Sequence, residues 1–94
     1  MDQMPTAEVL EKAHTFPGAF MFKAIGKADD DFVARVVAAV REELAGDVDP
    51  PYTLRETSGG KHVAVTLEPY VQTPAQVLAV YRRIQGVAGL VMLL

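Results

Sequence analysis

Apolar residues stand on both sides of the segment from Phe20 to Gly26. In an extended strand, successive side chains point to opposite sides. One side here carries Phe20, Phe22 and Ala24, and the other carries Met21, Lys23 and Ile25. A strand that is apolar on both sides lies in the interior of a sheet. Because the chain is too short to place a full layer on each side of that sheet, we expect one side to lack cover.

Three other stretches are predicted to form helices, from their apolar spacing or from their capping residues. Residues 32–44 have Phe32, Val36, Val40 and Leu44 at every fourth position, which predicts an amphipathic helix closed by Gly46. The sequence Thr73-Pro74-Ala75-Gln76 combines a capping box with proline at the first helical position, and it predicts a second helix that ends at Gly86. A shorter helix is expected from Thr6 to His14, with Thr6 as its N-cap.

A hairpin is predicted around Gly59-Gly60, because a two-residue turn of this kind needs positive φ at both positions. The flanking strands are Tyr52–Ser58 and Lys61–Tyr70. Pairing Ser58 with Lys61 gives a register in which Leu54 faces Val65, Tyr52 faces Leu67 and Glu56 faces Val63. Most of the large apolar groups then share one side of the hairpin.

The last segment, Leu90–Leu94, predicts a final strand that lies beside the first one. Strict alternation places Val91 and Leu93 on the side opposite to Leu90. The order of elements is then strand, helix, strand, strand, helix, strand. This order defines an α+β, ferredoxin-like βαββαβ fold with a four-stranded antiparallel sheet and two helices on one face. We expect a single domain over residues 16–94 and a helical extension over residues 1–15.

Composition limits the classes of function. The 94 residues are half hydrophobic, carry a formal net charge of −3 and include no cysteine. One packed core, a reducing cytoplasmic location and no disulfide or thiolate site are expected, and the net charge disfavours nucleic acid as a partner. The start of the chain, Met1 to Pro5, does not read as a secretory signal, and no apolar run reaches the roughly 20 residues of a membrane span.

Several short patterns together resemble the YbeD-like family, small bacterial proteins of unknown function. The resemblance runs from about Leu10 to the C-terminus and rests on Phe16-Pro17, Lys23-Ala24-Ile25-Gly26, Ser58-Gly59-Gly60-Lys61, Gln76-Val77 and Val91-Met92-Leu93-Leu94. It implies a ferredoxin-like fold similar to ACT domains, which bind amino acids and regulate enzymes, and it implies no catalytic activity. The ACT comparison points to an effector near Gly26–Asp29. His62 departs from the family's usual tyrosine, and the segment Asp47–Pro51 is longer.

Candidate chemistry is sparse. Asp29-Asp30-Asp31 has carboxylates that a divalent cation could bind, but no spaced ligand set accompanies it, so a capped helix start is the preferred interpretation and no metal or cofactor is expected. His14 and His62 belong to no catalytic signature. An acylphosphatase, which has this topology, needs an asparagine that the chain lacks. An RNA-binding module remains a distant alternative, because such a sheet stacks bases on aromatic side chains and the expected face offers Met21, Ile25 and Ala64 instead.

Two functions are carried forward, with no enzyme activity in either. The first is a binding or regulatory module whose uncovered sheet face contacts a second copy or another protein, and the second is a sensor of an amino-acid-like effector. The residues assigned to this ligand or interface site are Met21, Lys23, Ile25, Gly26, Val91 and Leu93. Lys23 either meets a carboxylate of a ligand or a partner, or it extends to solvent or pairs with Glu68. Neither function is supported if the N-terminal helix covers that face with Val9, Leu10 and Ala13, because the apolar residues are then buried within the chain itself.

Overall fold

The computed structural model describes residues 4–29, 31–57 and 59–94. The helices are α1 (Ala7–Ala13), α2 (Phe32–Glu43) and α3 (Pro74–Gln85). The strands are β1 (Gly18–Ala19), β2 (Phe22–Lys27), β3 (Tyr52–Glu56), β4 (His62–Leu67), β5 (Tyr70–Val71) and β6 (Leu90–Leu93). No helix in these ranges has the length and apolar character of a membrane span.

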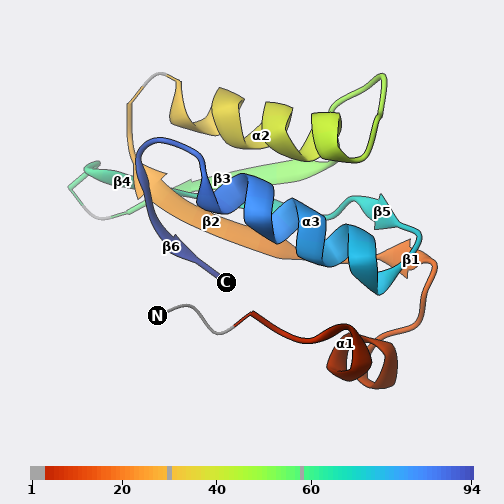
Figure 1. Cartoon of the computed structure of the whole chain (residues 1–94). Helices are drawn as coiled ribbons and strands as arrows, with labels where there is room; N and C mark the ends of the chain where they lie inside the picture. The colour runs from red at the N-terminus through yellow and green to blue at the C-terminus, as the bar shows by residue number, and fades with distance from the viewer. Residues whose placement is uncertain (1–3, 30, 58) are drawn as a thin grey trace.

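The main sheet has four antiparallel strands in the order β3-β4-β2-β6. Helices α2 and α3 lie together on one face of this sheet (Figure 1). This arrangement confirms the predicted ferredoxin-like fold, with β2 and β4 at the centre of the sheet. Among the described residues, no helix packs across the other face of the sheet.

The core lies between the sheet and the two long helices. Its largest fully buried side chains include Phe22 of β2, Phe32 of α2, Leu67 of β4 and Ile84 of α3. Each such side chain contributes about 1.5–3 kcal/mol when it leaves water. The helical periodicity of the sequence therefore identified the buried side of α2 correctly, although valine favours strands when it stands alone.

The hairpin between β3 and β4 has the predicted register. Leu54 faces Val65, Tyr52 faces Leu67 and Glu56 faces Val63. Gly59 and Gly60 have φ values of 87° and 70°, as a two-residue turn with positive φ requires. The predicted pairing of Ser58 lies outside the described residues.

Helix α2 ends one residue earlier than the position of Gly46 suggested. The amide of Ala45 donates to the carbonyl of Glu42 and the amide of Gly46 donates to the carbonyl of Arg41, which together form a Schellman motif. In this motif the left-handed residue comes first, and it is Ala45, with φ 54°. The expectation that Gly46 closes the helix was therefore wrong by one position.

Two short strands were not predicted. β1 pairs with β5 in a separate two-stranded antiparallel sheet, in which Gly18 faces Val71 and Ala19 faces Tyr70. The amide of Phe20 extends the contact by donating to the carbonyl of Pro69. This small sheet joins the chain before β2 to the chain before α3.

Helix α1 begins as predicted, because the amide of Val9 donates to Oγ1 of Thr6. It packs beside α3 (Figure 1), and Leu10 enters the main core. Val9 remains 56% exposed. Since α1 adds to the helical side of the molecule, it does not use its apolar residues to cover the other face of the sheet.

The alternation predicted for the last strand is broken. Ala24 pairs with Leu93 and Ile25 pairs with Met92, but Gly26 pairs with Leu90, so one residue, Val91, is inserted at the shift. Leu93 therefore lies on the helical side and packs against the core. Its predicted place on the uncovered face was wrong, because a bulge reverses the side on which every following residue lies.

Candidate functional site

The side of the main sheet that faces away from α2 and α3 is called the open face here. Two adjacent rows of residues cross it from β3 to β6. The first row is Arg55, Ala64, Ile25 and Met92, and the second is Thr53, Thr66, Lys23 and Leu94. In each row the β3 end is polar and the β6 end is apolar.

The β6 side of the open face exposes several large apolar side chains. We call this group the apolar strip. It consists of Ile25, Met92 and Leu94, which the strand pairing places on this face, together with the exposed Met21, which precedes β2, and the exposed Val91, which is inserted at the register shift. Met21, Val91, Met92 and Leu94 are each at least half exposed, whereas Ile25 is partly covered by its neighbours. Neighbouring apolar groups that remain in water are typical of a surface that contacts another molecule.

Lys23 lies within this strip. Its main chain is paired with Leu94 on one side and Thr66 on the other, which fixes the residue in the interior of the sheet. The ion pairs of the described chain are all made by arginine, so the ammonium group of Lys23 has no carboxylate partner there. The alternative in which Glu68 neutralises Lys23 is therefore not formed.

Two other residues assigned to the site face the core instead. Leu93 does so because of the register shift. Gly26 is buried, and a Cβ at this position would lie 2.2 Å from Cζ of Phe32. The close approach of the Phe32 ring is sufficient to explain the absence of a side chain at Gly26.

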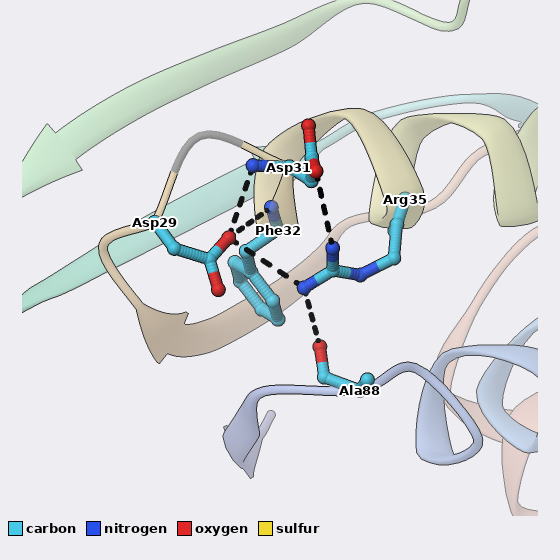
Figure 2. Close-up of polar contacts among 5 residues, drawn as sticks. All are labelled: Asp29, Asp31, Phe32, Arg35 and Ala88. Carbon is cyan, nitrogen blue, oxygen red and sulfur yellow. Dashed lines mark hydrogen bonds and ion pairs between the residues drawn. The ribbon is translucent and has the colours of Figure 1, made fainter.

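The loop from β2 to α2 is organised around Asp29 (Figure 2). Oδ1 of Asp29 accepts hydrogen bonds from the amides of Asp31, at 3.0 Å, and Phe32, at 2.8 Å. These bonds, followed by the nearby guanidinium of Arg35, lower the pKa of the Asp29 carboxyl group below its ordinary value of 3.8. Asp29 therefore caps α2, as the helix-start interpretation predicted. Asp30 lies outside the described residues.

Arg35 joins this loop to the start of β6. Its Nη2 lies 3.6 Å from Oδ1 of Asp29 and donates a 3.0 Å hydrogen bond to the carbonyl of Ala88, while Nη1 lies 4.0 Å from Asp31 (Figure 2). The carboxylates of Asp29 and Asp31 are thus engaged by the protein itself. Across the described ranges, no three His, Asp or Glu side chains are grouped as a metal site would need.

A shallow hollow of about 380 Å³ lies between this loop and the β3–β4 hairpin. The amide of Ala28 donates to the carbonyl of Lys61 and holds the two segments together. Lys27, Lys61 and His62 line the hollow together with Asp29. Two ammonium groups near one hollow favour an anionic occupant, although the hollow is wide open to solvent.

Several residues of the site were missed from the sequence. Met92 and Leu94 occupy the open face, where strict alternation had placed Leu93. Nothing in the run Leu90–Leu94 marks the inserted residue, because all five side chains are apolar. The glycine before this run, Gly89, has a positive φ of 93°, which is the only local feature that accompanies the irregularity.

Fold and site together define a small ferredoxin-like α+β domain with one uncovered, partly apolar sheet face. The chain belongs to the family described as Protein of unknown function (DUF493), whose model matches residues 11–94. This result confirms the resemblance to small YbeD-like bacterial proteins. The family description assigns no activity, so the function must be argued from the surface.

Relatives in the genus Shewanella carry the name UPF0250 protein. One from Shewanella sp. strain ANA-3 is 34% identical over 74 residues, which cover 79% of this chain and 82% of the relative. A protein of Shewanella oneidensis is 32% identical and one of Shewanella amazonensis is 31% identical, with the same coverage. The matched part is therefore about four fifths of each relative and of this chain.

Proposed function

We propose that this chain is a non-enzymatic, cytoplasmic binding module that contacts another protein through the apolar strip and Lys23. The observation that carries the proposal is the exposure of Met21, Val91, Met92 and Leu94 on a face that α1 leaves uncovered. Transfer of apolar area from water into an interface is the main favourable term in protein association. A partner that covers the strip gains this term without a change of fold in the module.

Lys23 gives the proposed contact a second requirement. An ammonium group surrounded by Ile25, Leu94 and Thr66 loses water when a partner covers the face, and this loss is costly unless an opposite charge arrives with the partner. The partner surface should therefore be apolar with one carboxylate. Such a carboxylate sets the orientation and discriminates against surfaces that lack it.

The test uses the exposed Met92. Met92→Asp places a charge in the strip, and Val48→Asp places the same charge on a side chain that is 78% exposed in the α2–β3 connection. Proteins that co-purify with the wild-type chain from its own cells are identified and then purified, and their affinity is measured by titration calorimetry. We expect Met92→Asp to weaken binding at least roughly tenfold and Val48→Asp to leave it unchanged. Equal binding by both variants would remove the strip from the interface.

A second candidate function is the sensing of a small carboxylate, and the hollow lined by Lys27 and Lys61 favours it. It lies beside Gly26–Asp29, where the ACT comparison implies an effector. A ligand that binds the native state raises the melting temperature by mass action. Amino acids and dicarboxylates are therefore screened by thermal shift against the wild type and a Lys27→Met, Lys61→Met double variant. A shift that persists in the double variant, or no shift at all, would reject this site.

A further inference from the structure

Strand β3 is exposed along its whole length, including the side chains that point toward the helical layer. Tyr52 and Leu54 share a side with the buried Val65 and Leu67, yet they remain 43% and 53% exposed. The cause is the position of α2, which packs over β4 and β2 and stops short of β3. The helical layer therefore leaves an unfilled place above this edge strand.

This place is a groove of about 470 Å³ between α2 and β3. Val33, Ala34, Val37 and Ala38 form its α2 wall, and Tyr52 forms its β3 side. The ion pair between Arg41 and Asp49, with a 2.6 Å contact, stands at its rim. The side chains of a bound segment can enter this apolar groove while its main chain pairs with the adjacent edge strand, β3.

The main chain of β3 has hydrogen-bonding groups available at its outer edge. The carbonyl of Pro51 accepts a hydrogen bond from the amide of Glu68, and the amide of Thr57 donates one to the carbonyl of His62. Hydrogen-bonded residues alternate along an antiparallel strand, so the main chains of Thr53 and Arg55 also bond β4. The amides and carbonyls of Tyr52, Leu54 and Glu56 therefore point outward. No strand in the described part of the chain pairs with them. The pairing with β4 is continuous over β3, whereas the other edge strand, β6, is interrupted by its register shift.

We propose that two copies of this chain pair in antiparallel fashion along β3, with Thr53 facing Thr53 of the second copy. In this register, Tyr52 of each copy lies opposite Leu54 of the other, on the side of the groove. An aromatic residue opposite an aliphatic one and a threonine opposite a threonine are both favourable cross-strand pairs. The outward amide of Glu56 meets the carbonyl of Pro50 of the second copy.

Charge selects this register over those centred on Arg55 or Leu54. A pairing centred on Arg55 sets two guanidinium groups directly opposite each other, and a pairing centred on Leu54 makes them diagonal neighbours. Centring on Thr53 separates the two Arg55 residues by about 14 Å along the strands. This separation exceeds the screening length of about 8 Å at physiological ionic strength, so the repulsion is small.

The paired form is one eight-stranded sheet, with the helices of both copies on one side and both open faces on the other. The β3 edge takes no part in the contact proposed for the apolar strip, so each proposal can fail without the other. Met92→Asp tests the strip and leaves β3 intact. The variants below test β3 and leave the strip intact.

The first test uses the absence of cysteine in the chain. Thr53 and its copy form a non-hydrogen-bonded pair, whose Cα atoms lie about 4.5 Å apart, within the range of a disulfide. Thr53→Cys should therefore form a disulfide-linked dimer under mild oxidation. Val48→Cys, which is also exposed, and Arg55→Cys serve as matched controls and should remain largely monomeric. Equal yields from all three variants, or the highest yield from Arg55→Cys, would overturn the proposal.

The second test measures association without cross-linking. Sedimentation equilibrium should show a dimer of the wild type at micromolar to hundred-micromolar concentration. Thr53→Lys and Thr53→Glu should each weaken it roughly fivefold, because like charges then face each other, and an equal mixture of the two should restore it. Circular dichroism checks that each variant is folded. A wild type that stays monomeric, or a mixture that associates no better than its components, would contradict the proposed pairing.

Discussion

The ring of Phe32 lies against the main chain of Gly26, so that a Cβ on Gly26 would stand 2.2 Å from Cζ of Phe32. This contact joins the first turn of α2 to the central strand. It leaves no room for any side chain at residue 26. The ring is fully buried, and because protein interiors are closely packed, a shift of the ring would disturb its neighbours.

Gly26→Ala should therefore destabilise the protein by about 1–3 kcal/mol, the usual cost of forcing extra atoms into a packed core. Urea denaturation measures this change. Gly86→Ala is the control, because its Cβ would meet only the carbonyl of Arg83 at an ordinary 3.5 Å. Adding Phe32→Leu to Gly26→Ala should recover part of the loss caused by the clash. Equal stability of the two alanine variants would show that the contact is not tight.

Ala45 holds a left-handed conformation that favours glycine, with φ 54°. Ala45→Gly should stabilise the protein by roughly 0.5–1 kcal/mol, because the strain at this position exceeds the extra flexibility of glycine in the unfolded chain. The midpoint of urea unfolding measures the gain. Gly46→Ala, one residue later, should give no such gain. A loss of stability in Ala45→Gly would mean that the Schellman motif is not maintained.

The pKa of Asp29 is lowered in the folded state by two amide hydrogen bonds and by Arg35. A carboxyl group with a lowered pKa adds stability above its unfolded pKa, and that stability is lost as the pH falls through the folded value. Asp29→Asn keeps a capping oxygen but removes the charge. We expect the wild type to be more stable than Asp29→Asn at pH 7.

The difference should shrink once the pH falls below about 4 and vanish in stronger acid, where both side chains are neutral. Melting temperatures across this range measure it. Asp29→Ala, which also removes the cap, should remain less stable than Asp29→Asn throughout. A constant difference between wild type and Asp29→Asn at every pH would contradict the role assigned to the charge.

Leu93 and Met92 lie on opposite sides of the sheet from those that strict alternation predicts. Leu93→Ala should cost about 1–3 kcal/mol, because this residue packs against the core. Met92→Ala should change the free energy of unfolding by no more than about 0.5 kcal/mol, since the side chain is half exposed. The same denaturation experiment compares the two. A larger loss of stability in Met92→Ala than in Leu93→Ala would show that the strand alternates strictly and that Met92 does not lie on the open face.

The parts of the fold that follow from local pattern could be predicted. The register of the β3–β4 hairpin follows from Gly59-Gly60 and the alternation on each side of it, and the stripe on α2 follows from its helical spacing. The start of α1 follows from Thr6, whose hydroxyl oxygen can accept a hydrogen bond from an amide in the first turn of the helix. These features depend on residues close together in the sequence.

The remainder depends on contacts between distant residues. The insertion at Val91 arises where β6 meets β2, and no residue type in Leu90–Leu94 indicates it. Strands of two residues, such as β1 and β5, are too short for any periodicity to reveal. The position of α1 beside α3 is set by Leu10 entering a core built mostly from other segments. The place of Ile25 on the open face could thus be predicted, whereas the places of Met92 and Leu94 could not.

The two rows that cross the open face change from polar to apolar along the same direction. Arg55 and Thr53 stand at one end, and Met92 and Leu94 stand at the other. Such a gradient distinguishes two orientations of a partner that differ by a half turn about the normal to the sheet. Only one of them sets the partner's apolar groups against Met92 and Leu94 and its polar groups against Arg55 and Thr53. A partner that binds the open face, as proposed above, would therefore be held in one orientation, and that orientation would set the direction in which the rest of the partner extends.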